Sequence, residues 1–176
     1  LLPGHYLTYQ NGELNVTQYF DPTLEPVSKD SQEELVKKLT DVLEDSVDKH
    51  MLADVEVGAF LSSGVDSSYI AAKYSGKKTF TVGFFDKNNQ YSETQYAEEC
   101  AKFLGLENYS HQITEEEYWG EMPKIMYHMD EPLADPAAIA LYFVAREATK
   151  QVKVVTSGEG ADEFFGGYTI YREPLS

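Results

Sequence analysis

The sequence has a single cysteine and no long apolar run. Cys100 cannot form a disulfide within the chain, which fits a cytoplasmic location. Its neighbours are neither glycine-rich nor basic, so we interpret it as a packing residue rather than a nucleophile of lowered pKa. No apolar segment approaches the roughly 18 residues of a membrane span, so we expect no membrane partner.

Basic residues are also scarce. The 176 residues include 14 Lys and Arg against 30 Asp and Glu, a formal net charge of −16. Such a balance argues against a broad positive face and therefore against nucleic acid as a partner. The four histidines show no zinc-ligand spacing. A polyanion such as ATP stays compatible with this charge, because a divalent cation and backbone N–H groups can hold it locally.

One stretch combines an apolar run with small polar residues. Val55–Leu61 suits a strand buried on both faces, and Ser62–Ser68 precedes a helical pattern. Small side chains let backbone N–H groups crowd around an oxyanion at the positive end of a helix, which predicts a phosphate-binding loop. A carboxylate beside phosphate needs a cation between them, so we assign Asp66 to magnesium.

This loop resembles the pyrophosphate loop of ATP pyrophosphatases, whose pattern is Ser-Gly-Gly-x-Asp-Ser. Ser63 stands where that pattern has a glycine, and it is still a small residue. No lysine follows Gly64, so the loop is not of the Walker A type. An ordinary turn between a strand and a helix, rich in Ser and Gly, is the alternative.

Strands and helices alternate along the rest of the chain. Alternation of this kind predicts an α/β fold, a doubly wound parallel sheet flanked by helices. Further strands are expected at Thr79–Phe85, Tyr109–Ile113 and Gln151–Thr156. Helices are expected over 32–50 with an apolar packing stripe, after Ser92 and Thr114 as caps, and from Pro136 to Lys150; Gly76 and Gly105 are expected to end helices. We interpret Glu115–Glu117 as a solvated helix start rather than a metal site.

The N-terminal residues form a separate pattern. His5–Phe20 alternates around Asn11-Gly12, a strong hairpin signal, and an isolated hairpin is marginal in water. Pro22 and Pro26 predict an extended connector. We therefore divide the chain into a hairpin remnant of another domain (1–20), a connector (21–30) and a nucleotide domain (31–176).

A second unusual loop, Ser157–Tyr168, follows the last predicted strand. It contains four glycines and the acids Glu159, Asp162 and Glu163. That many glycines indicate a backbone that approaches a ligand or turns with positive φ. Ligands of open parallel sheets bind at the carboxyl ends of strands, where both loops are expected. We assign Asp162 to magnesium opposite Asp66; a glycine-rich turn with exposed carboxylates is the alternative.

With both motifs together, the chain resembles the synthetase domain of glutamine-dependent asparagine synthetases. The resemblance runs from about Leu2 to Tyr171. The resemblance implies an adenine nucleotide alpha hydrolase-like fold. It implies that Asp66 and Asp162 hold magnesium and that Glu159 lies near the aspartate and ammonia chemistry. The residues expected to bind ATP are Leu61, Ser62, Ser63, Gly64, Asp66, Ser67, Ser68, Val82, Gly83, Ser157 and Gly158.

The implied reaction is adenylation of the aspartate side chain by ATP, release of pyrophosphate, and transfer of ammonia supplied by a glutaminase domain. Pro3-Gly4-His5-Tyr6 resembles the end of that domain, and a homodimer of the longer protein is compatible with the family. The family's N-terminal nucleophilic cysteine has no counterpart here, and its later lysine is expected beyond Ser176. We therefore expect this chain alone to be catalytically incomplete.

Several alternatives stay open at the level of sequence. Related enzymes that form a β-lactam ring or a lasso peptide share both loops, and a nucleotide-binding module without turnover would also carry them. Asp130, Glu131 and Asp135 either shape an acceptor pocket or cap the following helix.

Overall fold

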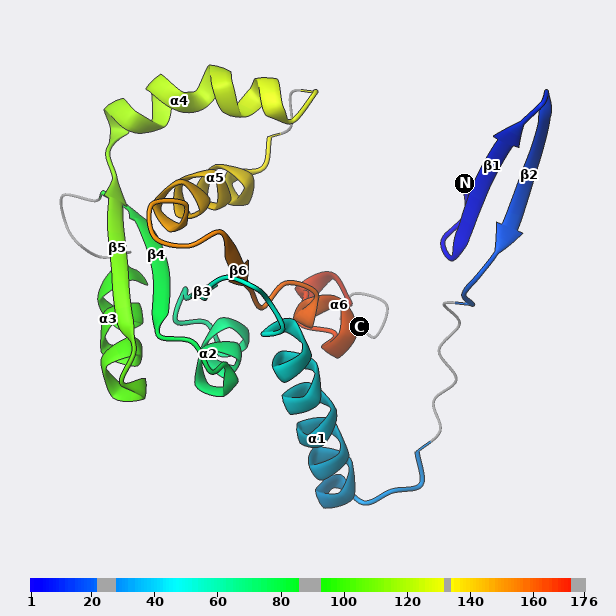
Figure 1. Cartoon of the computed structure of the whole chain (residues 1–176), viewed down its shortest axis with the longest axis horizontal. Coiled ribbons are helices and arrows are strands. Elements are labelled where there is room, and N and C mark those ends of the chain that lie inside the picture. The colour runs from blue at the N-terminus through cyan, green and yellow to red at the C-terminus, as the bar shows by residue number, and fades with distance from the viewer. Residues whose placement is uncertain (22–27, 86–92, 132–133, 172–176) are drawn as a thin grey trace. The chain divides into compact units, whose positions relative to one another are not determined.

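The computed structural model describes residues 1–21, 28–85, 93–131 and 134–171 (Figure 1). It divides into two compact units, Leu1–Leu39 and Thr40–Ser176. Its elements are β1 (His5–Gln10), β2 (Glu13–Gln18), α1 (Gln32–His50), β3 (Val57–Phe60), α2 (Val65–Lys73), β4 (Lys78–Phe84), α3 (Glu93–Leu104), β5 (Glu107–Ile113), α4 (Glu115–His128), α5 (Pro136–Ala148), β6 (Val154–Thr156) and α6 (Ala161–Phe165).

The first unit contains the predicted hairpin. β1 and β2 pair antiparallel, and Asn11 and Gly12 both have positive φ, 53° and 85°, as a tight primed turn requires. The predicted capping box is also present, because the Ser31 backbone N–H donates to Glu34 Oε2 at 2.8 Å and the Glu34 N–H donates back to Ser31 Oγ. The connector prolines Pro22 and Pro26 lie outside the described residues.

The second unit is built on a four-stranded parallel sheet in the order β5-β4-β3-β6. The chain runs from β3 outward through β4 to β5, then returns so that β6 pairs with the other edge of β3. The connections therefore reverse direction between β3 and β6. In open α/β sheets this switch point is where a crevice forms at the carboxyl ends of the strands. The predicted doubly wound parallel sheet is confirmed.

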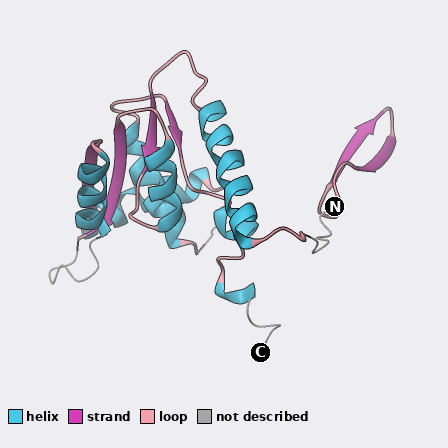
Figure 2. Ribbon diagram, turned by 90° about the horizontal axis from the view of Figure 1, so that it is seen from below, coloured by secondary structure: helices cyan, strands magenta, loops and turns pink. Residues whose placement is uncertain are grey.

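Helices cover both faces of this sheet (Figure 2). On one face Leu61 packs with alanines of α2 and α3, and Val47 of α1 packs with Ala59. On the other face Phe80 of β4 packs with Val144 of α5. The two central strands, β3 and β4, are mostly buried because helices cover both faces, whereas the edge strand β5 is largely polar and partly exposed.

The ends and apolar faces of the helices match the predictions only in part. α2 ends at Lys73 with Tyr74 as its C-cap, so the prediction that Gly76 ends this helix is wrong. A Cβ on Gly76 would lie 2.7 Å from the Val57 carbonyl oxygen, so close packing accounts for this glycine. Gly105 does end α3, with φ of 71°, whereas the proposed cap Ser92 lies outside the described residues. Only Val47 in α1 is buried, so most of its apolar stripe is not a packing face in the described chain.

None of the described helices combines the length and the apolar character needed to cross a bilayer.

Candidate functional site

The two unusual loops meet at the predicted edge of the sheet. β3 leads into Ser62–Gly64, and β6, paired directly with β3, leads into Ser157–Gly160. A Cβ placed on Gly158 would lie 3.0 Å from the carbonyl carbon and Cβ of Asp66 and 3.0 Å from the Ser67 nitrogen. The second loop therefore lies directly against the start of α2, about ninety residues away in sequence.

The first loop is closed by its own serines. The Ser62 backbone N–H donates to Ser67 Oγ at 3.1 Å, and the hydroxyls of these two serines lie 3.0 Å apart. Gly64 is the N-cap of α2, and no side chain caps the helix there. The first-turn N–H groups of α2 are therefore left for an anion, which the helix dipole favours.

An open cavity of about 330 Å³ lies between these loops and α5. Ten of the predicted site residues line it: Leu61, Ser62, Gly64, Asp66, Ser67, Val82, Ser157, Gly158, Glu159 and Asp162. The carboxylates expected to face one another are thus in the same cavity.

Three predicted site residues, all within the described ranges, do not line this cavity. Ser63 instead has a left-handed backbone, φ of 67°, at the position where the pyrophosphate-loop pattern has glycine. Ser68 Oγ lies 3.7 Å from the thiol of Cys100, which is partly buried beside the α2–α3 cluster, as expected of a packing residue. Gly83 is buried, and a Cβ there would meet the Thr94 side chain at 2.8 Å.

The charge of the cavity lining is one-sided. Among the described residues it contains four carboxylates, Asp66, Glu159, Asp162 and Glu163, and no basic side chain. Glu163 accepts a hydrogen bond from the Tyr168 hydroxyl at 2.7 Å, and this bond raises the pKa of Tyr168 to about 12. A phosphate chain can therefore enter this lining only with a cation beside it.

Magnesium fits this donor set. It binds through one or two carboxylates together with phosphate oxygens and water rather than in a closed protein cage. Asp66 and Asp162 supply two such carboxylates from opposite loops. Among the described residues there is no group of three or more His, Cys, Asp or Glu side chains that could hold a metal ion.

Comparisons with known proteins identify the family of this chain. The family model for asparagine synthase matches residues 38–176. The chain belongs to the asparagine synthase family. It is 51% identical over 179 residues to asparagine synthetase [glutamine-hydrolyzing] 1 of Bacillus subtilis, covering 99% of this chain and 28% of that protein. It is 49% identical over 167 residues to a putative asparagine synthetase [glutamine-hydrolyzing] of Mycobacterium tuberculosis H37Rv, covering 92% of this chain and 25% of that protein.

The chain thus spans little more than a quarter of the length of these asparagine synthase relatives. Among solved structures, the NMN synthetase from Francisella tularensis matches with a TM-score of 0.46 and 21% identity, over 81% of this chain and 61% of that one.

Other residues that line the cavity were not predicted as site residues from the motifs. Tyr168 and Glu163 lie within the second loop, but Ala137, Ala140, Leu141 and Val144 come from α5. Their spacing of three and four residues places them on one helical face, which is the signal that could have found them. Of the open alternatives for Asp135, helix capping is the one observed, because Asp135 Oδ1 accepts from the Ala137 N–H at 2.9 Å.

Proposed function

We propose that this chain forms the ATP-binding and adenylating part of an amidotransferase that converts aspartate to asparagine. The single observation that carries the proposal is the shared cavity, in which Asp66 and Asp162 lie with the serine loop at the switch point of the sheet. Membership of the asparagine synthase family supports the choice of reaction.

Each part of the cavity has a role in this proposal. The strand-end residues Leu61, Val82, Ser157 and Gly158 contact the adenosine part. The phosphates lie at Ser62, Gly64 and Ser67, against the uncapped start of α2. Asp66 and Asp162 hold magnesium, which when bound would offset the repulsion between two anions and stabilise the leaving pyrophosphate.

The reaction itself proceeds in two displacements. A carboxylate oxygen of aspartate forms a bond to the α-phosphorus, and the bond from that phosphorus to the β-phosphate oxygen breaks, so that pyrophosphate leaves. Ammonia then attacks the acyl carbon, AMP departs and one proton is lost. Glu159 lines the cavity and is exposed, so it can orient ammonia or accept that proton. Ammonia comes from a glutaminase domain of the full-length protein. Residues 1–20 are the end of that glutaminase domain.

Pyrophosphate release by the full-length protein tests this proposal. We expect release from ATP to require aspartate and magnesium, and D66N and D162N each to lower its rate at least about 100-fold. D54N, which changes an exposed aspartate outside the cavity, is the matched control and should leave the rate unchanged. Equal release with and without aspartate would refute asparagine synthesis. Intact ATP binding with no release would instead indicate a nucleotide-binding module.

A further inference from the structure

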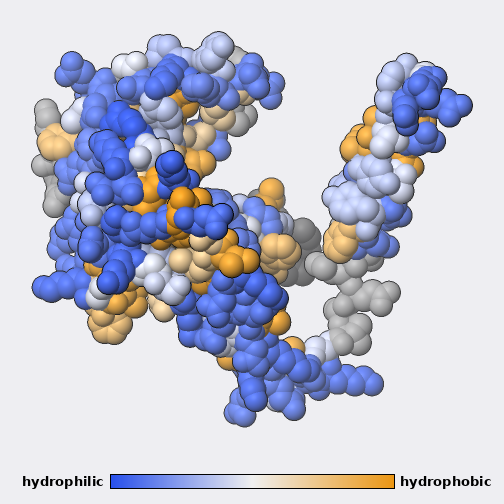
Figure 3. Space-filling model, in the orientation of Figure 1, coloured by the Kyte–Doolittle hydropathy of each residue, from blue (hydrophilic) through white to orange (hydrophobic). Residues whose placement is uncertain are grey.

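Few polar side chains of this chain are buried, and most of the surface in view is hydrophilic (Figure 3). Among the described residues the buried polar side chains are Thr79, Thr81 and Thr94, which are 0%, 1% and 4% exposed. Thr79 and Thr81 lie two positions apart on β4, so they point to the same face of the sheet. Burial of a hydroxyl is unfavourable unless it forms hydrogen bonds, so the partners of these threonines show what they hold in place.

Asn108 of β5 joins these two threonines. Its amide nitrogen donates to Thr79 Oγ1 at 3.0 Å and to Thr81 Oγ1 at 2.9 Å. Each hydroxyl in turn donates to a backbone carbonyl. The acceptor for Thr79 is Glu107, at 2.9 Å. The acceptor for Thr81 is Leu61, at 2.7 Å. A hydroxyl has a single proton, so these donations leave only lone pairs facing Asn108, and the network fixes the direction of both hydroxyl protons.

Leu61 is the residue at which the chain leaves the sheet. Pairing of β3 with β4 ends at Phe60, and the Leu61 N–H makes one further bond to the Phe80 carbonyl at 2.9 Å. The Leu61 carbonyl accepts from the Thr81 hydroxyl, and the Leu61 side chain is buried against alanines of α2 and α3. The last residue before the serine loop is thus held at its nitrogen, its side chain and its carbonyl.

The Leu61–Ser62 peptide carries this position into the loop. A peptide group is planar and trans, so its C=O and N–H point in opposite directions. Thr81 holds the carbonyl end. The N–H end, at Ser62, donates to Ser67 Oγ at 3.1 Å. Ser62 and Ser67 line the cavity and are residues to which we assign the phosphates. Rotation of this one peptide would therefore move the groups proposed to face the ligand.

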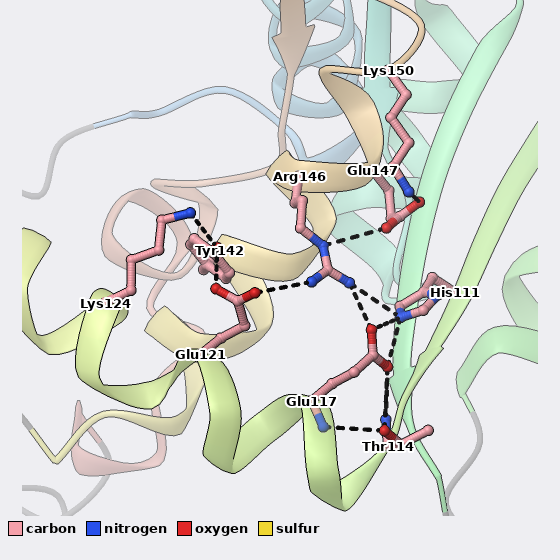
Figure 4. A network of polar contacts seen from close by, with 9 residues as sticks. All are labelled: His111, Thr114, Glu117, Glu121, Lys124, Tyr142, Arg146, Glu147 and Lys150. Carbon is pink, nitrogen blue, oxygen red and sulfur yellow. Dashed lines mark hydrogen bonds and ion pairs between the residues drawn. The ribbon is translucent and has the colours of Figure 1, made fainter.

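A second polar network does not reach the cavity (Figure 4). There Arg146 of α5 donates to Glu117 of α4 at 2.9 Å and forms an ion pair with Glu121 at 3.7 Å. The side chains of these three ions are 28–32% exposed, and none of the residues drawn belongs to the described lining of the cavity. That network joins two helices, whereas the buried network of β4 and β5 ends at the serine loop.

We propose that Thr81 is a positioning residue for the serine loop that binds phosphate. Its hydroxyl, oriented by the Asn108 amide, holds the Leu61–Ser62 peptide in its binding orientation before the ligand arrives. A loop that is already ordered loses less entropy on binding and so binds more tightly. This inference rests on the proposed function. Thr81 acts through the Leu61 carbonyl and not through contact with the reacting atoms.

Titration of the full-length protein with the magnesium salts of ATP and of inorganic tripolyphosphate tests the role of Thr81. T81V replaces the hydroxyl with a methyl group of similar size, so the Leu61 carbonyl loses its donor. We expect both ligands to bind about tenfold more weakly, and by the same factor, because the loop holds the part that they share. T81S keeps the hydroxyl and should restore both affinities to within about twofold of the wild type.

T79V is the matched control. It makes the same substitution on the same strand, at a side chain that is equally buried and accepts from the same Asn108 amide. The carbonyl left without its donor is that of Glu107, which lies outside the cavity lining. We therefore expect T79V to lower the urea midpoint of unfolding about as much as T81V does, and to bind both ligands as the wild type does.

Other results would overturn the proposal. Wild-type affinity in T81V, an equal loss of affinity in T79V, or failure of T81S to restore binding would show that Thr81 does not position the loop. A loss for ATP without a loss for tripolyphosphate would do the same. A wild type that binds neither ligand would instead overturn the proposed function, which is a distinguishable result.

T81A provides the second test if T81V does not fold, because it removes the hydroxyl without adding volume. It should weaken the binding of both ligands about fivefold. Unchanged affinity for both ligands in T81A would overturn the assignment of Thr81.

Discussion

Substitution of Gly158 by alanine tests directly whether the two motifs form one site. The added Cβ would lie 3.0 Å from three atoms of the opposite loop, the carbonyl carbon and Cβ of Asp66 and the nitrogen of Ser67. Two of these atoms belong to the backbone at the start of α2, so no side-chain rotation can relieve the contact. The loops must separate by a few tenths of an ångström.

The expected cost is larger for binding than for folding. Overpacking of this kind costs about 1–3 kcal/mol, and the lower entropy of alanine in the unfolded chain returns about 0.4–1 kcal/mol. We therefore expect G158A to lower the free energy of unfolding by about 1 kcal/mol. The same displacement moves Asp66 and the N–H groups that would bind phosphate, so magnesium–ATP affinity should fall at least about tenfold.

Urea denaturation and calorimetric titration with magnesium–ATP measure the two effects in the full-length protein. G120A is the matched control, because Gly120 is exposed within α4 and a Cβ there meets nothing within 4 Å. It should raise the free energy of unfolding by about 0.5–1 kcal/mol and leave ATP affinity unchanged. Wild-type ATP affinity in G158A would refute the claim that the two loops form one binding site.

Three further predictions concern stability, measured by chemical denaturation. The Arg146 hydrogen bond and the Thr114 backbone lower the pKa of Glu117 to about 2 from an ordinary value near 4.5. The ionised side chain therefore stabilises the fold above about pH 4.5 and loses this effect as the pH falls through 2. E117Q should lower the free energy of unfolding at pH 7 by about 1–2 kcal/mol, allowing for a side chain that is 30% exposed, and the difference should vanish near pH 2. S63G should raise the free energy of unfolding by up to about 1 kcal/mol, because glycine adopts a φ of 67° without strain; a loss of stability would contradict this reading. D135A should remove the α5 cap and cost about 1 kcal/mol, and an unchanged unfolding midpoint would show that the cap contributes nothing.

The secondary structure was largely predictable because its signals are local. The capping box at Thr114 and Glu117 is present with both hydrogen bonds, and Gly105 ends α3 with positive φ. Gly76 does not end α2, because its small size is required by a close approach to the Val57 carbonyl oxygen of β3. A single glycine signals either a helix end or close packing, and the local sequence is the same in both cases.

For the site, the local sequence alone predicts the proposed chemistry, since small residues, a loop without lysine and two aspartates favour a metal-bound phosphate wherever they fold together. Tertiary structure alone decided how the remaining space is enclosed. The pairing of β6 with β3 brings Gly158 against Asp66, and α5 turns one face to the core and the other to the cavity. Which side of an apolar helix meets a ligand depends on its neighbours in space, and these are set by long-range packing that no local pattern contains.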